Sequence, residues 1–136
     1  MQTKYNTNSS YGTVDNKTTL ELSDDAARAN WGGSWRMPTR AEQEELQNNC
    51  TWTWTTQNGV NGYKVTSKSN GNSIFLPAAG YRRDSSLNGA GGYGDYWSSS
   101  LYTGSPYYAW RLSFSSSCGL GGLSRFYGQS VRPVCQ

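Results

Sequence analysis

The chain has 136 residues, a net charge of +3 at neutral pH and 19 aromatic residues. This length suits one domain with a single core and is too short for two. Only 18 residues are Leu, Ile, Val or Phe, which alone would suggest disorder, but low net charge and many aromatics argue against it. Because a buried aromatic side chain hides roughly 150–250 Å², we expect a globular domain with an aromatic core.

The twelve Lys and Arg residues are scattered without any run, so the sequence predicts no nucleic-acid partner. No apolar stretch approaches the roughly 18 residues of a transmembrane helix, and no N-terminal signal pattern is present. We therefore expect no direct membrane insertion. Any export signal or anchor is expected to lie outside the given sequence.

Three cysteines, Cys50, Cys118 and Cys135, match neither a disulfide framework nor a zinc site, because no pair has the short spacing of zinc ligands. One disulfide with a free thiol and three reduced thiols are both compatible with this pattern.

Residues 1–19 are polar and loop-like, and we treat them as an N-terminal segment preceding a domain over residues 20–136. Ser23, followed by two acids, predicts the start of a short helix that runs to about Asn30 and ends at Gly32-Gly33. Thr39 and Glu42 form a capping-box pattern, which predicts a second helix to about Asn49.

Strand signals follow these helices. Residues 63–66 and 73–76 flank Asn70-Gly71, a sequence typical of a hairpin turn. Residues 108–115 alternate, which predicts a strand with Tyr108, Trp110, Leu112 and Phe114 on its inward face. A last short strand is expected at 130–134, with Gly-rich loops at 89–94 and 119–122. Two early helices and late antiparallel strands predict an α+β fold.

The composition changes between Tyr81 and Tyr127. These 47 residues contain no Lys, Glu, Gln or Met, while Gly, Ser and Tyr make up 26 of them. Antibody combining loops use the same residue types, because Tyr supplies rigid contact area while Ser and Gly supply adaptable hydrogen bonding. A β-and-loop region, which disfavours long charged side chains, is the plainer explanation. A cluster of aromatics among polar residues more often marks an interface.

Four segments occur in a specific order: Trp35–Glu42, Phe75–Tyr81, Tyr96–Ser100 and Gly128–Val134. This series resembles the C-type-lectin-fold domains of bacteria and their phages, specifically the variable proteins of diversity-generating retroelements. The resemblance covers roughly residues 20–135. It implies a C-type lectin fold, with a small antiparallel sheet and long Gly/Ser-rich loops, displayed on a cell surface or phage particle.

The resemblance also implies a cause for the change in composition. In such systems a reverse transcriptase miscopies adenines, and mutated AAC or AAT codons do not reach Lys, Glu, Gln, Met or Trp. The region at about 81–127 would then be diversified, while Trp97 and Trp110 belong to the fixed scaffold with Leu112 and Phe114. Cys118 would itself be a product of diversification, which would explain the odd cysteine count.

The resemblance therefore implies a ligand-binding site of outward or loop residues, gathered on one accessible surface. Arg83 and Asp84 are secondary candidates, and Tyr108 shares the inward face. The ligand-binding candidates are Tyr102, Gly104, Tyr107, Tyr108, Arg111, Ser113, Ser115, Gly119, Gly121, Gly122, Ser124, Phe126 and Tyr127.

Other chemistries have less support. The chain has no histidine, which removes Ser-His-Asp and Cys-His arrangements and every histidine metal site. Asp84 and Asp95 are the only acids after residue 45, too few for a calcium cage, and no Pro lies in a sugar-binding Glu-Pro-Asn or Gln-Pro-Asp motif. Oxidases of this fold use late cysteines, but their motifs are missing around Cys118 and Cys135.

We therefore expect a non-catalytic domain without cofactor or metal that binds a protein or glycan receptor on another cell or particle. The alternatives are an undiversified adhesion or carbohydrate-binding domain and a pilus or phage-fibre tip subunit of the same fold.

Overall fold

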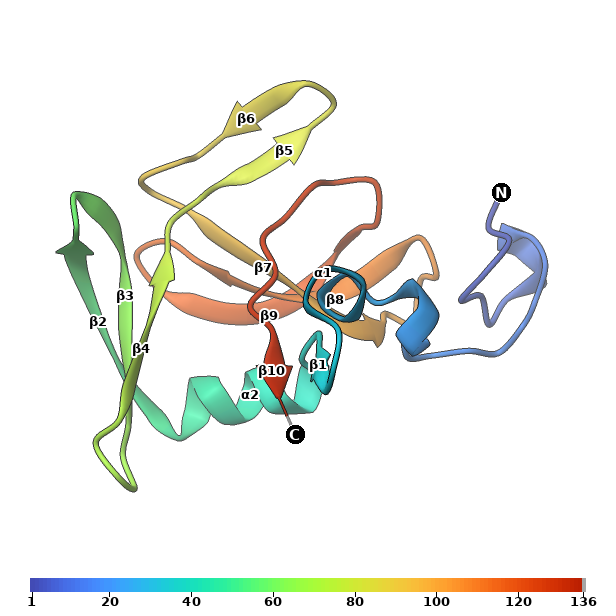
Figure 1. Ribbon diagram of the computed structural model, residues 1–136. Helices are drawn as coiled ribbons and strands as arrows, with labels where there is room; N and C mark the ends of the chain where they lie inside the picture. The colour runs from blue at the N-terminus through green and yellow to red at the C-terminus, as the bar shows by residue number, and fades with distance from the viewer. Residues whose placement is uncertain (136) are drawn as a thin grey trace.

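The computed structural model describes residues 1–135 (Figure 1). Its helices are α1 (Ala26–Trp31) and α2 (Arg40–Asn48), with two 3-10 turns, η1 (Ser9–Tyr11) and η2 (Leu22–Asp24). The strands are β1 (Trp35–Arg36), β2 (Cys50–Gln57), β3 (Val60–Ser67), β4 (Ser73–Pro77), β5 (Tyr81–Arg83), β6 (Ser86–Asn88), β7 (Gly94–Leu101), β8 (Tyr108–Phe114), β9 (Cys118–Ser124) and β10 (Val134–Cys135). Within these residues the strands form several small antiparallel sheets, so the expected α+β class is confirmed.

Both early helices form where capping signals predict them. The cap of α1 is Asp25, two residues after the expected Ser23, and its carboxylate accepts hydrogen bonds from two helix amides. Gly32 ends α1 with a positive φ of 66°, as its lack of a Cβ allows. At α2, the amide of Glu42 donates to Thr39 Oγ1 (3.2 Å), and the amide of Thr39 donates to the Glu42 carboxylate (2.9 Å). The capping box is confirmed.

The first sheet has the order β2-β3-β4. The β3–β4 hairpin is confirmed, but residues 68–72 form its loop, and only Gly71 of the expected turn pair has positive φ. β2 is absent from the expectations above. Its signal is the alternation of Trp and Thr before Asn58-Gly59, whose φ angles of 50° and 78° suit a two-residue turn.

The last sheet, with the order β7-β8-β9, shares the core cluster with the first sheet and contributes Tyr96, Leu112 and Phe114 to it. Leu112 and Phe114 on β8 are each 1% exposed, as the alternation predicts. The other two residues of that face differ, because they extend past the edge of the core. Trp110 is only half-buried and Tyr108 is 39% exposed.

The glycines at 119–122, expected in a loop, lie instead within β9. β8 supplies a complete ladder for this segment, and Leu120 packs against the core cluster. Tertiary pairing thus overrides the low strand propensity of glycine. The loop expected at 89–94 is confirmed up to Tyr93, and Gly94 begins β7.

The strand expected at 130–134 is wrong in extent. Ser130 forms only an isolated bridge with Tyr96, and the regular strand is limited to β10, which pairs with β1. Pro133 has no amide hydrogen for a ladder, which limits pairing at this position. The β1–β10 pairing joins the segment between α1 and α2 to the C-terminal part of the domain.

The N-terminal segment, expected to be loop-like, contains no long element but packs tightly on the domain. Tyr5 is 5% exposed and Asn6 is fully buried, and the Asp15 carboxylate accepts hydrogen bonds from both amides. The Arg125 guanidinium donates to the carbonyls of Tyr5 (3.3 Å) and Pro106 (2.9 Å). This arginine connects the N-terminal segment to the loop that follows β9.

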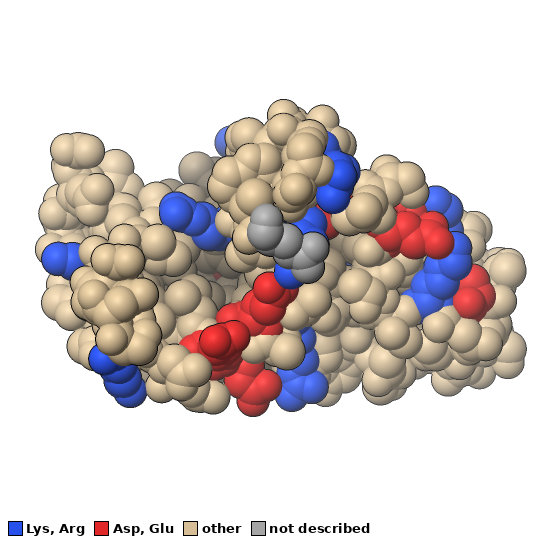
Figure 2. Space-filling model, turned by 60° about the horizontal axis from the view of Figure 1, so that its bottom comes forward, with Lys and Arg blue, Asp and Glu red and all other residues tan. Residues whose placement is uncertain are grey.

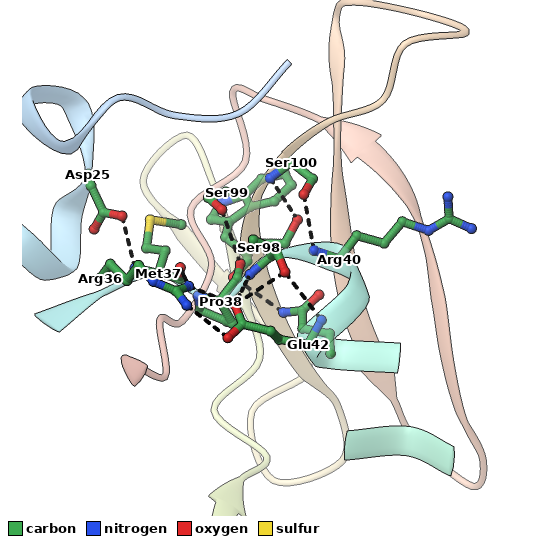
Figure 3. A network of polar contacts seen from close by, with 12 residues as sticks. Asp25, Arg36, Met37, Pro38, Arg40, Glu42, Ser98, Ser99 and Ser100 are labelled. Atoms are coloured by element: carbon green, nitrogen blue, oxygen red, sulfur yellow. Dashed lines mark hydrogen bonds and ion pairs between the residues drawn. The ribbon is translucent and has the colours of Figure 1, made fainter. Parts of the chain in front are cut away.

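The segments Trp35–Glu42 and Tyr96–Ser100 meet in a polar network (Figure 3). The amide of Ser99 donates to the carbonyl of Pro38 (2.8 Å), and the amide of Arg40 donates to Ser100 Oγ (3.0 Å). Ser98 Oγ donates to the carbonyl of Trp110 (2.7 Å), beside an irregularity in the β7–β8 register. These serines therefore satisfy backbone groups where the ladder is interrupted.

The other two segments also reach β7. Tyr96 Oη donates to the carbonyl of Pro77 (2.7 Å), and the amide of Trp97 donates to the carbonyl of Ser130 (3.0 Å). Gln43 of α2 donates to the carbonyls of both Tyr96 and Trp97. Three of the four segments quoted for the resemblance thus bond to the fourth, which is part of β7.

On the face that carries α2, Lys and Arg side chains lie dispersed among neutral and acidic ones (Figure 2). Across residues 1–135, no helix is long and apolar enough to cross a bilayer.

We predict that Gly94→Ala destabilises the domain by about 1–3 kcal/mol, because the added Cβ would overlap the fully packed ring of Phe114. The matched control is Gly119→Ala in the same sheet, where an added Cβ meets nothing within 4 Å. We expect the control to stay within about 0.5 kcal/mol of the parent. Urea unfolding measures both changes, and equal effects would contradict the packing described for Gly94.

We also predict that Glu42 contributes to the stability of the folded domain and that this contribution is lost in acid. The Arg36 guanidinium, with bonds of 2.6 and 2.9 Å, and the Thr39 amide lower the Glu42 pKa from 4.5 to about 2. A lowered pKa means that this stabilisation is complete above pH 4.5 and is lost as the pH falls towards 2. Glu42→Gln should therefore lose less stability than the parent between pH 5 and 2. Glu45→Gln, at an exposed carboxylate of the same helix, should behave as the parent does.

Candidate functional site

A shallow hollow of about 400 Å³ lies on the sheet face opposite the core, at one end of β8 and β9. We call it the outer hollow. Its lining combines aromatic, hydroxyl and glycine residues with one cation. The lining residues are Tyr93, Arg111, Ser113, Phe114, Ser115, Ser117, Cys118, Gly119, Leu120 and Gly121. Five of the thirteen predicted ligand-binding residues are among them.

The strand register explains why these five residues lie together. Arg111 pairs with Gly121, and Ser113 pairs with Gly119. Successive side chains alternate between faces, so these residues point away from Leu112 and the core. An added Cβ at Gly119 would meet nothing within 4 Å, and one at Gly121 would meet only Arg111 Nη1, at 3.7 Å. The two glycines therefore leave space above β9, which the side chain of Arg111 enters.

The charge of Arg111 is partly balanced by Asp95 of β7. Arg111 Nε lies 3.4 Å from Asp95 Oδ1, and the two side chains are 20% and 7% exposed. Burial raises the pKa of Asp95, while the charge of Arg111 and the Ser113 hydroxyl oppose that rise. Arg111 Nε is buried and makes no hydrogen bond within residues 1–135. The pair is thus a loose ion pair that orients the guanidinium at the hollow.

Tyr93 forms the rim of the outer hollow and was missed as a candidate. It is 51% exposed. Its ring lies so close to Gly89 that an added Cβ there would be 2.7 Å from the ring. The Tyr93 carbonyl accepts from the amide of Gly80 (2.8 Å). Its position within the Tyr-rich region was the available signal, but its proximity to β8 depends on the fold.

A second group lies on the opposite face of the same sheet, and we call it the aromatic patch. Tyr102 contacts Trp110 and Tyr108, with ring centroids 4.8 and 6.2 Å apart. The Arg40 guanidinium stacks on Trp110 at 3.7 Å. An added Cβ at Gly122 would lie 2.6 Å from the Tyr102 ring. Gly122 is thus a packing position, in contrast to Gly119 and Gly121.

The other candidates lie elsewhere. Tyr107 packs against Tyr11 of the N-terminal segment (4.9 Å), and Tyr127 packs against Phe126 (4.5 Å) and Tyr81 (5.8 Å). Of the secondary candidates, Arg83 ends β5 and Asp84 follows it with φ of 53°. Gly104 lies between β7 and β8, and Ser124 at the end of β9 shares the face of Tyr108.

The expectation of one continuous surface is therefore wrong. The thirteen residues divide among the outer hollow, the aromatic patch and the loops beside them. The physical reason is the alternation of β9, which places Gly121 and Gly122 on opposite faces.

No group of three or more His, Cys, Asp or Glu side chains that could hold a metal occurs in the part of the chain that the structure describes. Cys50 and Cys118 have free, half-buried thiols. Burial raises the pKa of the Cys118 thiol, which disfavours its nucleophilic thiolate form.

No curated protein and no solved structure matches the chain significantly. One family model does match: it covers residues 44–134, from α2 to β10, and includes the whole outer hollow. The chain therefore belongs to the family described as a domain of unknown function, DUF8237.

Proposed function

We propose that this domain is a non-catalytic binding module with a C-type lectin fold, whose outer hollow is varied by a diversity-generating retroelement to bind protein or glycan receptors. The observation that carries the proposal is the division of β8 between its two faces. Leu112 and Phe114 are buried in the core. Arg111, Ser113 and Ser115 line the outer hollow and are not part of the core.

The fold assignment within this proposal is supported by the arrangement of the elements. Two helices precede a small antiparallel sheet with Gly- and Ser-rich connections, as the resemblance implies. The segments that carry the resemblance converge on β7, so their side chains have scaffold roles. The region from Tyr81 to Tyr127 supplies the lining of the outer hollow.

Recognition at the outer hollow would depend on two side chains. Tyr93 offers a ring with little conformational freedom, and Arg111 offers a guanidinium whose position is set by Asp95. Tyr and Arg are the residue types most often found as binding hot spots. Because both are held by the sheet and its adjoining loop, little conformational entropy is lost on binding.

The nucleotide sequence around the gene tests the retroelement part of the proposal. We expect a near-repeat of the 3′ coding segment that differs almost only at adenines, beside a reverse transcriptase gene. A neighbourhood without such a repeat would contradict diversification and favour an undiversified adhesion domain of the same fold.

We predict that the outer hollow tolerates substitution. Gly119→Tyr should change the unfolding free energy by less than about 1 kcal/mol, because an added Cβ at Gly119 meets nothing within 4 Å. Gly122→Tyr is the control in the same strand. It should cost more, because it displaces the ring of Tyr102. Thermal and urea unfolding measure the difference, and a large loss of stability in Gly119→Tyr would contradict this prediction.

A selection experiment tests binding itself. A library randomised at Ser113, Ser115 and Gly119 should yield binders to a purified protein such as lysozyme, with affinities that fall at least tenfold in Tyr93→Ala. A control library randomised at Thr53, Gln57 and Lys64, which are exposed on the β2–β3 hairpin, should yield few binders. Equal yields from both libraries would contradict the assignment of the binding surface.

A further inference from the structure

β9 is the edge strand of the last sheet, and its Cys118 end lies against α2. The sheet order β7-β8-β9 leaves one side of β9 without a strand partner, and its register with β8 is regular from Cys118 to Ser124. The strand contains no proline, no charged residue and no bulge. Natural edge strands usually carry at least one of these features, because they prevent unintended pairing. Their absence here means that nothing within the strand itself opposes pairing with a further strand.

The hydrogen-bond pattern identifies the free backbone groups of this edge. The amide of Arg125 donates to the carbonyl of Tyr107 (2.9 Å). Because antiparallel pairs alternate, Gly119, Gly121 and Leu123 bond to β8. Cys118, Leu120, Gly122 and Ser124 point their amides and carbonyls away from the sheet.

Two contacts agree with this assignment. The carbonyl of Cys118 accepts from Gln47 Nε2 (3.1 Å), and that of Ser124 accepts from the amide of Tyr127 (3.2 Å). Between them, Leu120 and Gly122 have no backbone partner among residues 1–135. Two residues of the edge therefore present a free donor and a free acceptor each.

Side chains beside the edge indicate what would bind there. On the outer face, Arg111 extends over Gly121, with Nη1 3.7 Å from the site of a Cβ. Its Nε faces Asp95. On the other face, the ring of Tyr102 lies over Gly122. A strand added to β9 would thus meet a cation on one face and an aromatic ring on the other.

We propose that β9 binds an extended segment of a partner protein as an additional strand, with an acidic side chain beside Gly121 and an apolar one beside Gly122. This inference rests on the proposed binding function and names the kind of partner. Backbone pairing is a general mode of peptide recognition in which alternate side chains give specificity.

A second copy of this chain fits the edge less well. β9 contains no acid, so a copy paired at Gly121 would bring a second Arg111 beside the first and no acid beyond the Asp95 that each arginine already faces.

The test uses an end-blocked, nine-residue peptide that alternates threonine and valine and has glutamate at its centre. We expect saturable binding by fluorescence anisotropy. Hydrogen exchange should slow at least tenfold for the amides of Leu120 and Gly122, and change little for Gly119 and Gly121, which already bond to β8. Replacing the glutamate by lysine should weaken binding at least tenfold. Arg111→Gln should reduce this preference while the protection of Leu120 and Gly122 persists.

Peptide methylation provides the matched control. N-methyl groups on the amides that face β9 should abolish binding, while methyl groups on the alternate amides should not. Unchanged exchange at Leu120 and Gly122 with millimolar peptide would overturn the proposal. So would protection of these amides without peptide, together with dimers in sedimentation, because the occupant would then be a second copy.

The two proposals can fail separately. If binders selected through the outer hollow depend on Tyr93 but leave Leu120 and Gly122 unprotected, only the edge inference fails. If the peptide protects both amides but no selected binder depends on Tyr93 or Arg111, the proposed function fails and the edge site remains.

Discussion

The structure depends on the backbone of β7 between Tyr96 and Ser100. This stretch bonds to the β1–α2 connection through Pro38, to the N-terminal segment through the bridge between Thr19 and Ser100, and to the C-terminal segment through Ser130. The backbone N–H and C=O groups of a buried strand are all paired only if each neighbouring segment places its own backbone groups opposite them. The consecutive serines make this packing feasible, since their hydroxyls are small enough to be buried and still reach backbone acceptors.

Because these bonds hold β7 in place, they also determine which residues of the last sheet can be substituted without loss of the core. β8 pairs with β7 on one side and β9 on the other, so its two faces have separate roles over most of its length. Leu112 and Phe114 cannot change without loss of the core, whereas Ser113 and Ser115 contribute little to it. If the register of β8 against β7 shifted by one residue, the residues on its two faces would exchange these roles. The hydrogen bonds that hold β7 in place prevent such a shift.

Local signals in the sequence were sufficient for the helices and for β8, because capping residues and alternation act over a few positions. They were insufficient for β9, where three glycines form a strand only because β8 supplies a partner. The candidate site shows the same limit. Arg111, Ser113 and Ser115 followed from alternation along one strand, but Tyr93 reaches the outer hollow from a preceding loop. The division between Gly121 and Gly122 likewise required the register of β9 and the position of Tyr102.

The buried carboxylate of Asp95 bears on whether position 111 can vary at all. A buried charge left without its partner is usually costly, so replacing Arg111 would destabilise the domain if Asp95 kept its charge. Burial already raises the pKa of Asp95, and removing the arginine would remove the main influence that opposes this rise. Without the arginine, burial would favour the neutral, protonated form of the carboxyl group more strongly. Asp95 thus favours an arginine at position 111, and uptake of a proton is the route by which its carboxyl group would lose its charge if a neutral residue replaced that arginine.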